Sequence, residues 1–188
     1  MRMRRFLKIL SVIAAPFVLV GLFLGFLQIS GNFHEVAKGE LYRSAQPSAN
    51  AISSYARDYG IRTIINLRGK SSKATWYKTE VAAAGELGIR HVDFRMSAQR
   101  QLSEVETTQL IEILRDSPKP ILIHCQAGAD RSGLVAAIYL HAIKGVDVET
   151  AEKQISIRYG HIGIPYLSSA FAMDENWKKL ESLFRAKS

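Results

Sequence analysis

The sequence of 188 residues contains a single cysteine, Cys125. One cysteine cannot form an intramolecular disulfide, and a structural zinc site needs several Cys or His ligands at short spacings. The sequence also lacks any basic run interleaved with aromatic residues, and four of its eight excess positive charges fall within the first eight residues. We therefore expect no disulfide scaffold, no metal site and no nucleic-acid partner.

The first 30 residues differ in composition from the rest. Four basic residues precede an apolar run, residues 9–29, which only Ser11 and Gln28 interrupt. About 20 apolar residues are enough to cross a bilayer, whereas a cleaved signal peptide has a shorter apolar region and a small-residue cleavage site. We therefore expect residues 1–30 to form an uncleaved, single-pass transmembrane anchor. The positive-inside rule then predicts that the remaining chain lies outside the cytoplasm, in the periplasm if the organism is a bacterium.

Residues 31–188 are long enough for one domain with its own core. Short apolar segments alternate with amphipathic ones, which predicts an α/β fold with a central, mostly parallel sheet of four to five strands and helices on both faces. Strands are expected in a hairpin over 33–42 and at 61–67, 90–96 and 121–123. Helices are expected at 47–59, 76–87, 103–117, 134–143, 148–158 and 165–184.

The segment from His124 to Ser132, which we term the cysteine loop, lies between an expected strand and an expected helix. A strand, a turn of small residues and a helix start direct backbone N–H groups and the helix dipole to one point, which favours an anion. A thiol at a helix N-terminus beside an arginine ionises readily and is then a nucleophile. A phosphate monoester held by Arg131 and the loop amides would place its phosphorus against the sulfur of Cys125.

This geometry predicts a role for each residue of the loop. Attack by Cys125 would give a cysteinyl-phosphate that water hydrolyses, and Ser132 would donate a hydrogen bond to the departing thiolate. His124 would hold the loop in shape and favour the thiolate. The expected phosphate-binding residues are Gln126, Ala127, Gly128 and Ala129. No metal or organic cofactor is required, because the loop amides and Arg131 stabilise the charge.

The pattern His-Cys, five residues, Arg, Ser resembles the signature of the cysteine-dependent phosphatase superfamily, and within it the dual-specificity and atypical bacterial members. Residues 41–48 and 60–68 also resemble the opening of that group, so the likeness covers roughly residues 33–160. The resemblance implies a phosphatase fold and hydrolysis of phosphate monoesters by a protein tyrosine or dual-specificity phosphatase. It also implies a phosphorylated partner, which is a protein, a lipid head group or a sugar phosphate.

The sequence leaves three possibilities for the general acid that protonates the leaving oxygen. The resemblance expects it in residues 97–102, which contain no carboxylate. Asp93 precedes Cys125 by a family-like interval, but it shares a strand face with His91. Asp130 lies inside the cysteine loop, where atypical bacterial and lipid phosphatases resemble this sequence. The third possibility is that no protein group acts as the acid.

Four other polar residues are considered for a functional role. Arg43 is expected to pack under the sheet edge, and Arg68 follows a strand at the edge where ligands bind. Arg158 and His161 either border the pocket or lie at the surface. Three competing functions are a rhodanese-like sulfurtransferase, an arsenate reductase, which generally needs further thiols, and a membrane-anchored, non-catalytic phosphate-binding module.

Overall fold

A five-stranded sheet forms the centre of the computed structural model, which describes the backbone of residues 2–186 and the side chains of residues 12, 14–182 and 184. The strands are β1 (His34–Ala37), β2 (Leu41–Ser44), β3 (Thr63–Asn66), β4 (Arg90–Asp93) and β5 (Ile121–His124). Their order in the sheet is β1-β2-β5-β3-β4. Only β1 pairs antiparallel with its neighbour, which confirms the predicted mostly parallel sheet.

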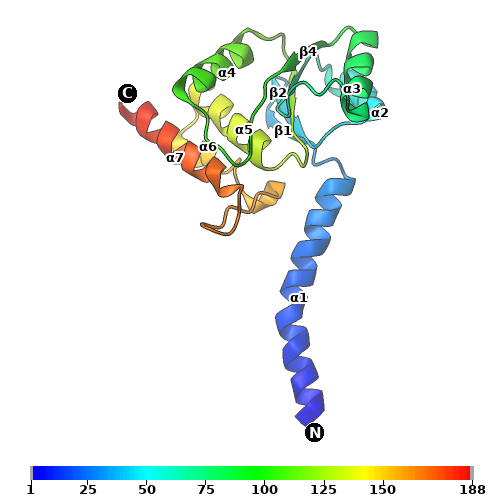
Figure 1. Ribbon diagram of the computed structural model, residues 1–188, viewed down its shortest axis with the longest axis vertical. Helices are drawn as coiled ribbons and strands as arrows, with labels where there is room; N and C mark the ends of the chain where they lie inside the picture. Colours follow the sequence, from blue (N-terminus) through cyan, green and yellow to red (C-terminus); the bar gives the residue numbers. More distant parts are fainter. Residues whose placement is uncertain (1, 187–188) are drawn as a thin grey trace.

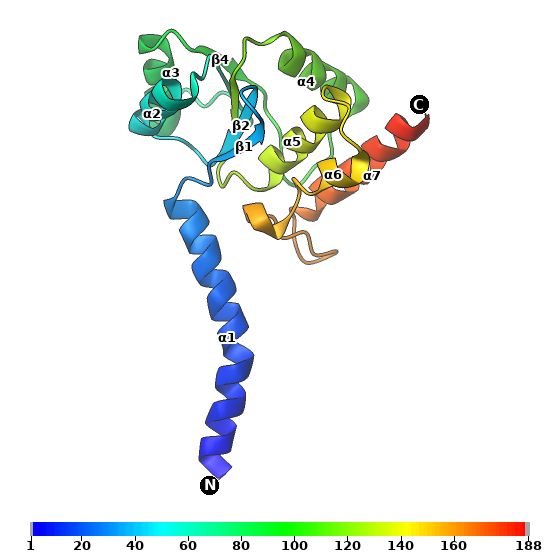
Figure 2. The same ribbon diagram turned by 180° about the vertical axis from the view of Figure 1, so that it is seen from behind.

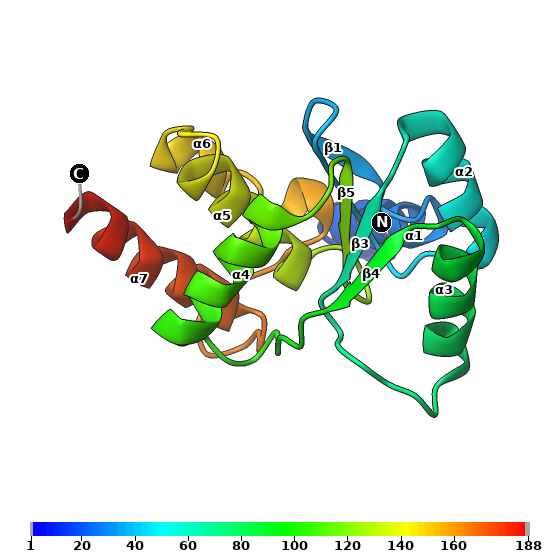
Figure 3. The same cartoon turned by 90° about the horizontal axis from the view of Figure 1, so that it is seen from above.

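Helices cover both faces of the sheet, as Figure 3 shows. One face is covered by α2 (Ala49–Tyr59) and α3 (Thr75–Glu86), and the other by α4 (Glu104–Asp116), α5 (Asp130–Ala142), α6 (Val148–Glu152) and α7 (Phe171–Ala186). All four residues of β5 are buried, because β5 lies between β2 and β3 with helices on either side. The apolar run that predicted this strand is typical of a strand covered on both faces.

Two helices are shorter than the sequence predicts. The helix expected over 148–158 ends at Glu152 and is followed by a short 3-10 turn, η1 (Ile157–Tyr159). The backbone carbonyl of Gln154 is instead bound by the Arg43 guanidinium at 2.8 Å. The helix expected from residue 165 begins only at Phe171, because Tyr166 has a left-handed backbone with φ of 64°, which a right-handed helix cannot include.

The first helix, α1 (Arg2–Ile29), runs away from the domain and meets it only near its C-terminal end (Figures 1 and 2). In the part of the chain that the structure describes, no helix combines the length and apolar character needed to cross a bilayer. The predicted single-pass transmembrane anchor over residues 1–30 is therefore wrong, and the extracytoplasmic location, which was derived from that anchor alone, loses its basis. Arg2, Arg4, Arg5 and Lys8, which supported that orientation, have side chains outside the described residues.

Only the end of α1 contacts the domain. Leu27 is 5% exposed, and its side chain approaches Gly160 together with that of Leu24. Most of the other described apolar side chains of this helix are exposed, among them Phe17 at 74% and Ile29 at 89%.

Candidate active site

The cysteine loop connects the C-terminal end of β5 to the first turn of α5. β5 is the central strand, so the loop lies in the middle of the sheet, beyond the C-terminal ends of the parallel strands, where α/β sheets bind ligands. Ala129 is the N-cap residue of α5 and makes no side-chain hydrogen bond to the first turn. The amide groups at this helix start therefore have no side-chain cap, which is the arrangement that binds anions.

The carbonyl groups of four successive loop residues are all bound by donors outside the loop. The pairs are Gln46 N with Gln126 O at 3.1 Å, Asn32 Nδ2 with Ala127 O at 2.9 Å, and Arg43 Nη2 with Gly128 O and Ala129 O, each at 2.9 Å. In a trans peptide the N–H group points opposite to the C=O group. Binding these carbonyls on the outside therefore turns the amides of residues 127–130 to the opposite side of the loop.

Cys125 is a free thiol within this loop and is 2% exposed. Three buried side-chain atoms of the loop, His124 Nδ1, Arg131 Nε and Ser132 Oγ, have no hydrogen-bond partner among the described residues. A buried polar group without a partner costs about 1–3 kcal/mol. The loop thus brings together a sulfur nucleophile and polar groups that have no hydrogen-bond partner in the structure and could bind an oxyanion.

Arg131 extends into a cavity of about 770 Å³. Its Nη1 donates to Leu67 O at 3.3 Å and to Met96 O at 3.4 Å, so the guanidinium lies across the ends of β3 and β4. The cavity is lined by Arg68, Arg95, Met96, Ser97, Ala98, Gln99, Arg100, Glu106 and Arg131. Glu106 is committed to Arg100, whose hydrogen bonds lower the pKa of Glu106 to about 2.

Arg68 is placed in the same cavity, as its position after β3 suggested. Its guanidinium lies 3.6 Å from the ring centre of Trp76 and donates to Gln46 Oε1 at 2.8 Å. Burial and the positive charge of Arg131 lower the pKa of Arg68. Arg68 and Arg131 are thus two of the four arginines that line this cavity, and their positive charges repel each other, a repulsion that an anionic ligand would reduce.

His124 is fully buried and is held by a glutamate that sequence reasoning missed. Its Nε2 pairs with Glu80 Oε1 at 2.9 Å, and His91 Nε2 pairs with the same oxygen at 2.7 Å. Gln46 donates to the other carboxylate oxygen of Glu80. Burial opposes ionisation of Glu80, but the hydrogen bonds from His124 and His91 outweigh it and lower its pKa to about 2.

The sequence held a signal for Glu80. Tyr77, Glu80, Ala83 and Ala84 are the buried residues of α3, and their spacing of three and four places them on one helix face. A carboxylate within such a stripe needs buried donors, because an unpaired charge is costly there. The two histidines and Gln46 supply them.

Arg43 and Asn32 support the loop from behind. Arg43 is fully buried, as the expected packing under the sheet edge required, and its Nη2 binds two loop carbonyls. The guanidinium carbon of Arg43 lies 4.2 Å from the centre of the Tyr159 ring. Asn32, 1% exposed, donates through Nδ2 to Ala127 O and to Tyr159 O at 2.8 Å.

The two candidate acids lie in different surroundings. Asp93 accepts hydrogen bonds from Asn66 Nδ2 at 2.8 Å and from the hydroxyl of Tyr77. Neither Asp93 nor Asp130 is among the residues that line the cavity of Arg131. Asp130 Oδ1 is bound by His161 Nδ1 at 2.7 Å. His161 is therefore neither a surface residue nor a residue of the pocket wall, because its side chain is 3% exposed beneath Asp130.

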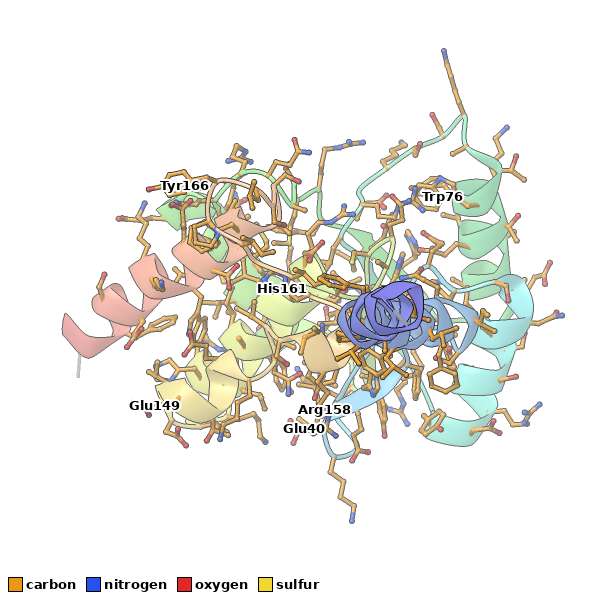
Figure 4. The ribbon with its side chains drawn as sticks, turned by 90° about the horizontal axis from the view of Figure 1, so that it is seen from below. Glu40, Trp76, Glu149, Arg158, His161 and Tyr166 are labelled. Atoms are coloured by element: carbon orange, nitrogen blue, oxygen red, sulfur yellow. The ribbon has the colours of Figure 1, made fainter. Side chains whose placement is uncertain are left out.

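Figure 4 labels His161 near the middle of the domain and Arg158 toward its edge. Arg158 is exposed beside the Tyr159 ring and lines no part of the Arg131 cavity. In the described part of the chain, no group of three or more His, Cys, Asp or Glu side chains is arranged to hold a metal ion.

Comparison with known proteins decides the family. Residues 27–164 match the family model described as DSP-PTPase phosphatase fused to NAD+ kinase. The chain belongs to this DSP-PTPase family. Among curated DSP-PTPase relatives, it is 28% identical over 120 residues to the dual specificity protein phosphatase TpbA of Pseudomonas aeruginosa strain UCBPP-PA14. This match covers 61% of the chain and 49% of TpbA, so the chain spans about half the length of the curated relatives it matches.

Solved structures show the same DSP-PTPase fold. The crystal structure of P. aeruginosa TpbA superposes with a TM-score of 0.60 at 22% identity, covering 80% of this chain and 85% of that one. The core catalytic domain of the PP-IP phosphatase SIW14 from S. cerevisiae gives a TM-score of 0.57 at 22% identity, covering 82% and 93%. These likenesses show that the chain shares its fold with these proteins.

Proposed function

We propose that this DSP-PTPase domain, within residues 31–188, hydrolyses phosphate monoesters through a cysteinyl-phosphate on Cys125. The observation that carries the proposal is the binding of four loop carbonyls from outside, which turns the amides of residues 127–130 inward. Arg131 Nε and Ser132 Oγ add two uncommitted groups in the same loop. This set complements the equatorial oxygens of a phosphoryl group during transfer.

The reaction proceeds in two balanced steps. The thiolate of Cys125 attacks phosphorus, an S–P bond forms, the ester P–O bond breaks, and the leaving oxygen takes a proton from Asp130. Water then attacks phosphorus, the S–P bond breaks, and a proton of the water returns to Asp130. The hydroxyl of Ser132 donates a hydrogen bond to the departing thiolate, and His124, fixed by Glu80, holds the loop.

We propose a phosphorylated substrate that approaches through the arginine-lined cavity. Phosphoprotein, a lipid head-group phosphate and a sugar phosphate are the candidates. The phosphoprotein candidate is supported by the relative TpbA, a variant of which has been crystallised in complex with pTyr. A panel of phosphotyrosine peptides, phosphoserine peptides, dispersed phospholipids and sugar phosphates, compared by kcat/KM, ranks these candidates.

The direct test is hydrolysis of para-nitrophenyl phosphate by the full chain. We expect turnover by the native chain, none by Cys125→Ser, and a loss of about 10²-fold or more in kcat for Arg131→Lys, which keeps the charge but not the paired donors. Arg62→Lys, at an exposed position, is the matched control. Mass spectrometry of acid-quenched enzyme should show one added phosphoryl group on Cys125.

Two outcomes would contradict the proposal. Full activity in Cys125→Ser would exclude the sulfur as the nucleophile. Phosphate binding without turnover would favour the non-catalytic phosphate-binding module, which the lack of a carboxylate in residues 97–102 suggested.

A further inference from the structure

Three side chains that are distant in sequence form a linear array at the cysteine loop. His161 Nδ1 donates to Asp130 Oδ1 at 2.7 Å, and His161 Nε2 donates to Asp174 Oδ2 at 2.9 Å. Asp130 begins α5, His161 follows η1, and Asp174 lies in the first turn of α7. The imidazole is 3% exposed, whereas Asp130 and Asp174 are 28% and 26% exposed.

The array requires a proton that a neutral histidine does not carry. A neutral imidazole has one N–H group, whereas here both ring nitrogens face a carboxylate oxygen. Burial opposes protonation of the ring, but the hydrogen bonds to Asp130 and Asp174 outweigh it and raise the pKa of His161. The charged groups that face the ring are these two carboxylates, from α5 and α7. Arg43, from β2, interacts electrostatically with Asp130.

We propose that Asp130 and His161 act as one proton-holding unit for the phosphatase reaction, with His161 as a positioning residue that Asp174 orients. This inference rests on the proposed function, and it assigns a source and an acceptor to the proton that each step moves. His161 does not touch substrate, so its effect passes through the Asp130 carboxyl group. Asp130 is partly exposed, whereas His161 is buried, and Asp130 is next to Arg131 in sequence.

The proton count of the unit closes over the cycle. Before the first step, one exchangeable proton is shared between Asp130 Oδ1 and His161 Nδ1. Breaking the ester P–O bond transfers that proton to the leaving oxygen and leaves an Asp130 carboxylate beside a neutral imidazole, whose Nε2–H still binds Asp174. Attack of water on the cysteinyl-phosphate returns a proton to the unit, releases phosphate and regenerates the thiolate.

Two other carboxylates considered above do not offer this arrangement. Asp93 is bound by Asn66 and Tyr77 outside the cavity, and Glu106 is paired with Arg100. Residues 97–102 carry no carboxylate. Asp130 is therefore the one acid in the loop itself, and its partner His161 is sealed from water.

The test compares a substrate that needs an acid with one that does not. An alkyl phosphate has a poor leaving group, whereas para-nitrophenyl phosphate leaves with little protonation. His161→Asn keeps a donor near the Nδ1 position but cannot hold the exchangeable proton. We expect it to lower kcat for the alkyl phosphate by about 10²-fold while changing kcat for para-nitrophenyl phosphate less than about 3-fold.

Asp174→Asn provides a second, nearly isosteric variant. It removes one of the two negative charges that hold the imidazole protonated, so the alkaline limb of the kcat profile for the alkyl phosphate should move to lower pH. The plateau of that profile should change little. His141→Asn is the matched control. His141 lies on α5, its Nδ1 is 2.8 Å from Val146 O, and it lines no part of the cavity.

The outcomes separate this inference from the proposed function. Equal losses on both substrates in His161→Asn, or an unmoved alkaline limb in Asp174→Asn, would overturn the proton-holding unit and leave cysteine-dependent hydrolysis intact. Activity remaining in Cys125→Ser would overturn the proposed function itself. Thermal unfolding of each variant shows whether a loss reflects folding, and in that case the Asp174→Asn profile decides.

Discussion

Arg43 donates from Nη2 to the carbonyl oxygen of Gly128 at 2.9 Å, and this contact joins the second strand to the cysteine loop. The guanidinium is fully buried, and burial lowers the pKa of Arg43 to about 10. The group remains charged at neutral pH, so it places a positive charge behind the loop. Arg43 is thus both a support for the loop backbone and a source of favourable potential for an anion.

Replacing Arg43 should damage stability and catalysis together. Arg43→Met keeps much of the side-chain volume but leaves the carbonyls of Gly128, Ala129 and Gln154 without this donor. We expect a loss of about 2–4 kcal/mol in the free energy of unfolding and at least a 10-fold fall in kcat. Urea unfolding and para-nitrophenyl phosphate turnover measure the two effects. The exposed Arg62→Met should change neither, and a native-like Arg43→Met would contradict the role described.

Gly128 offers a separate test of loop geometry. Its φ is +70°, and a Cβ atom there would lie 2.6 Å from Ala45 N and from Ser44 C. Gly128→Ala must therefore displace the main chain of the loop from β2, and we expect kcat to fall by about 10²-fold. Gly145 has a similar φ of +68° but open space around it. Gly145→Ala should cost only about 1 kcal/mol and leave kcat unchanged.

Glu80 should make stability depend on acid pH. Its pKa is lowered from an ordinary value of 4.5 to about 2, so its stabilising contribution is complete above pH 4.5 and is lost as the pH falls toward 2. Glu80→Gln should destabilise the protein by about 2 kcal/mol at pH 6, and the difference from the native chain should shrink at pH 3. Glu86→Gln, on the exposed face of the same helix, is the control. A difference independent of pH would contradict this assignment.

Arg68 should contribute to substrate binding through its charge. Arg68→Met removes one of the four guanidinium groups of the arginines that line the cavity but keeps an apolar chain against Trp76. We expect KM for an anionic substrate to rise about 10-fold, equivalent to about 1.4 kcal/mol, and the effect to weaken with added salt. Arg90→Met, in a different cavity, should leave KM unchanged. A fall in kcat with constant KM would assign Arg68 to catalysis instead.

The sequence predicts the parts of this molecule that local pattern determines. Buried β5 appears as an apolar run, and the capping box of Ser103 and Glu106 marks the start of α4, as observed. The cysteine loop follows from the spacing of Cys125 and Arg131 between a strand and a helix. These features depend on residues that are close in the chain, so the local sequence is enough to predict them.

Other parts depend on partners that are remote in the chain. Glu80 and His124 are 44 residues apart, and His161 and Asp130 are 31 apart. The stripe on α3 indicates that Glu80 is buried, but no local pattern indicates which partner either residue has. The apolar run over residues 9–29 also predicted a transmembrane helix, but no described helix has the length and apolar character to cross a bilayer. The general acid stayed open, since its assignment depends on which carboxylate the fold brings to the loop.

The contacts behind the cysteine loop also set when the loop takes shape as the chain is made. Asn32 is bound to Tyr159, 127 residues later, and Arg43 to Gln154, 111 residues later. At a synthesis rate of about 5–20 residues per second, the earlier partner waits roughly 6–25 s for the later one. The full set of hydrogen bonds that these two residues donate behind the loop can therefore be completed only after residue 159 has been synthesised, long after Asn32 and Arg43 themselves.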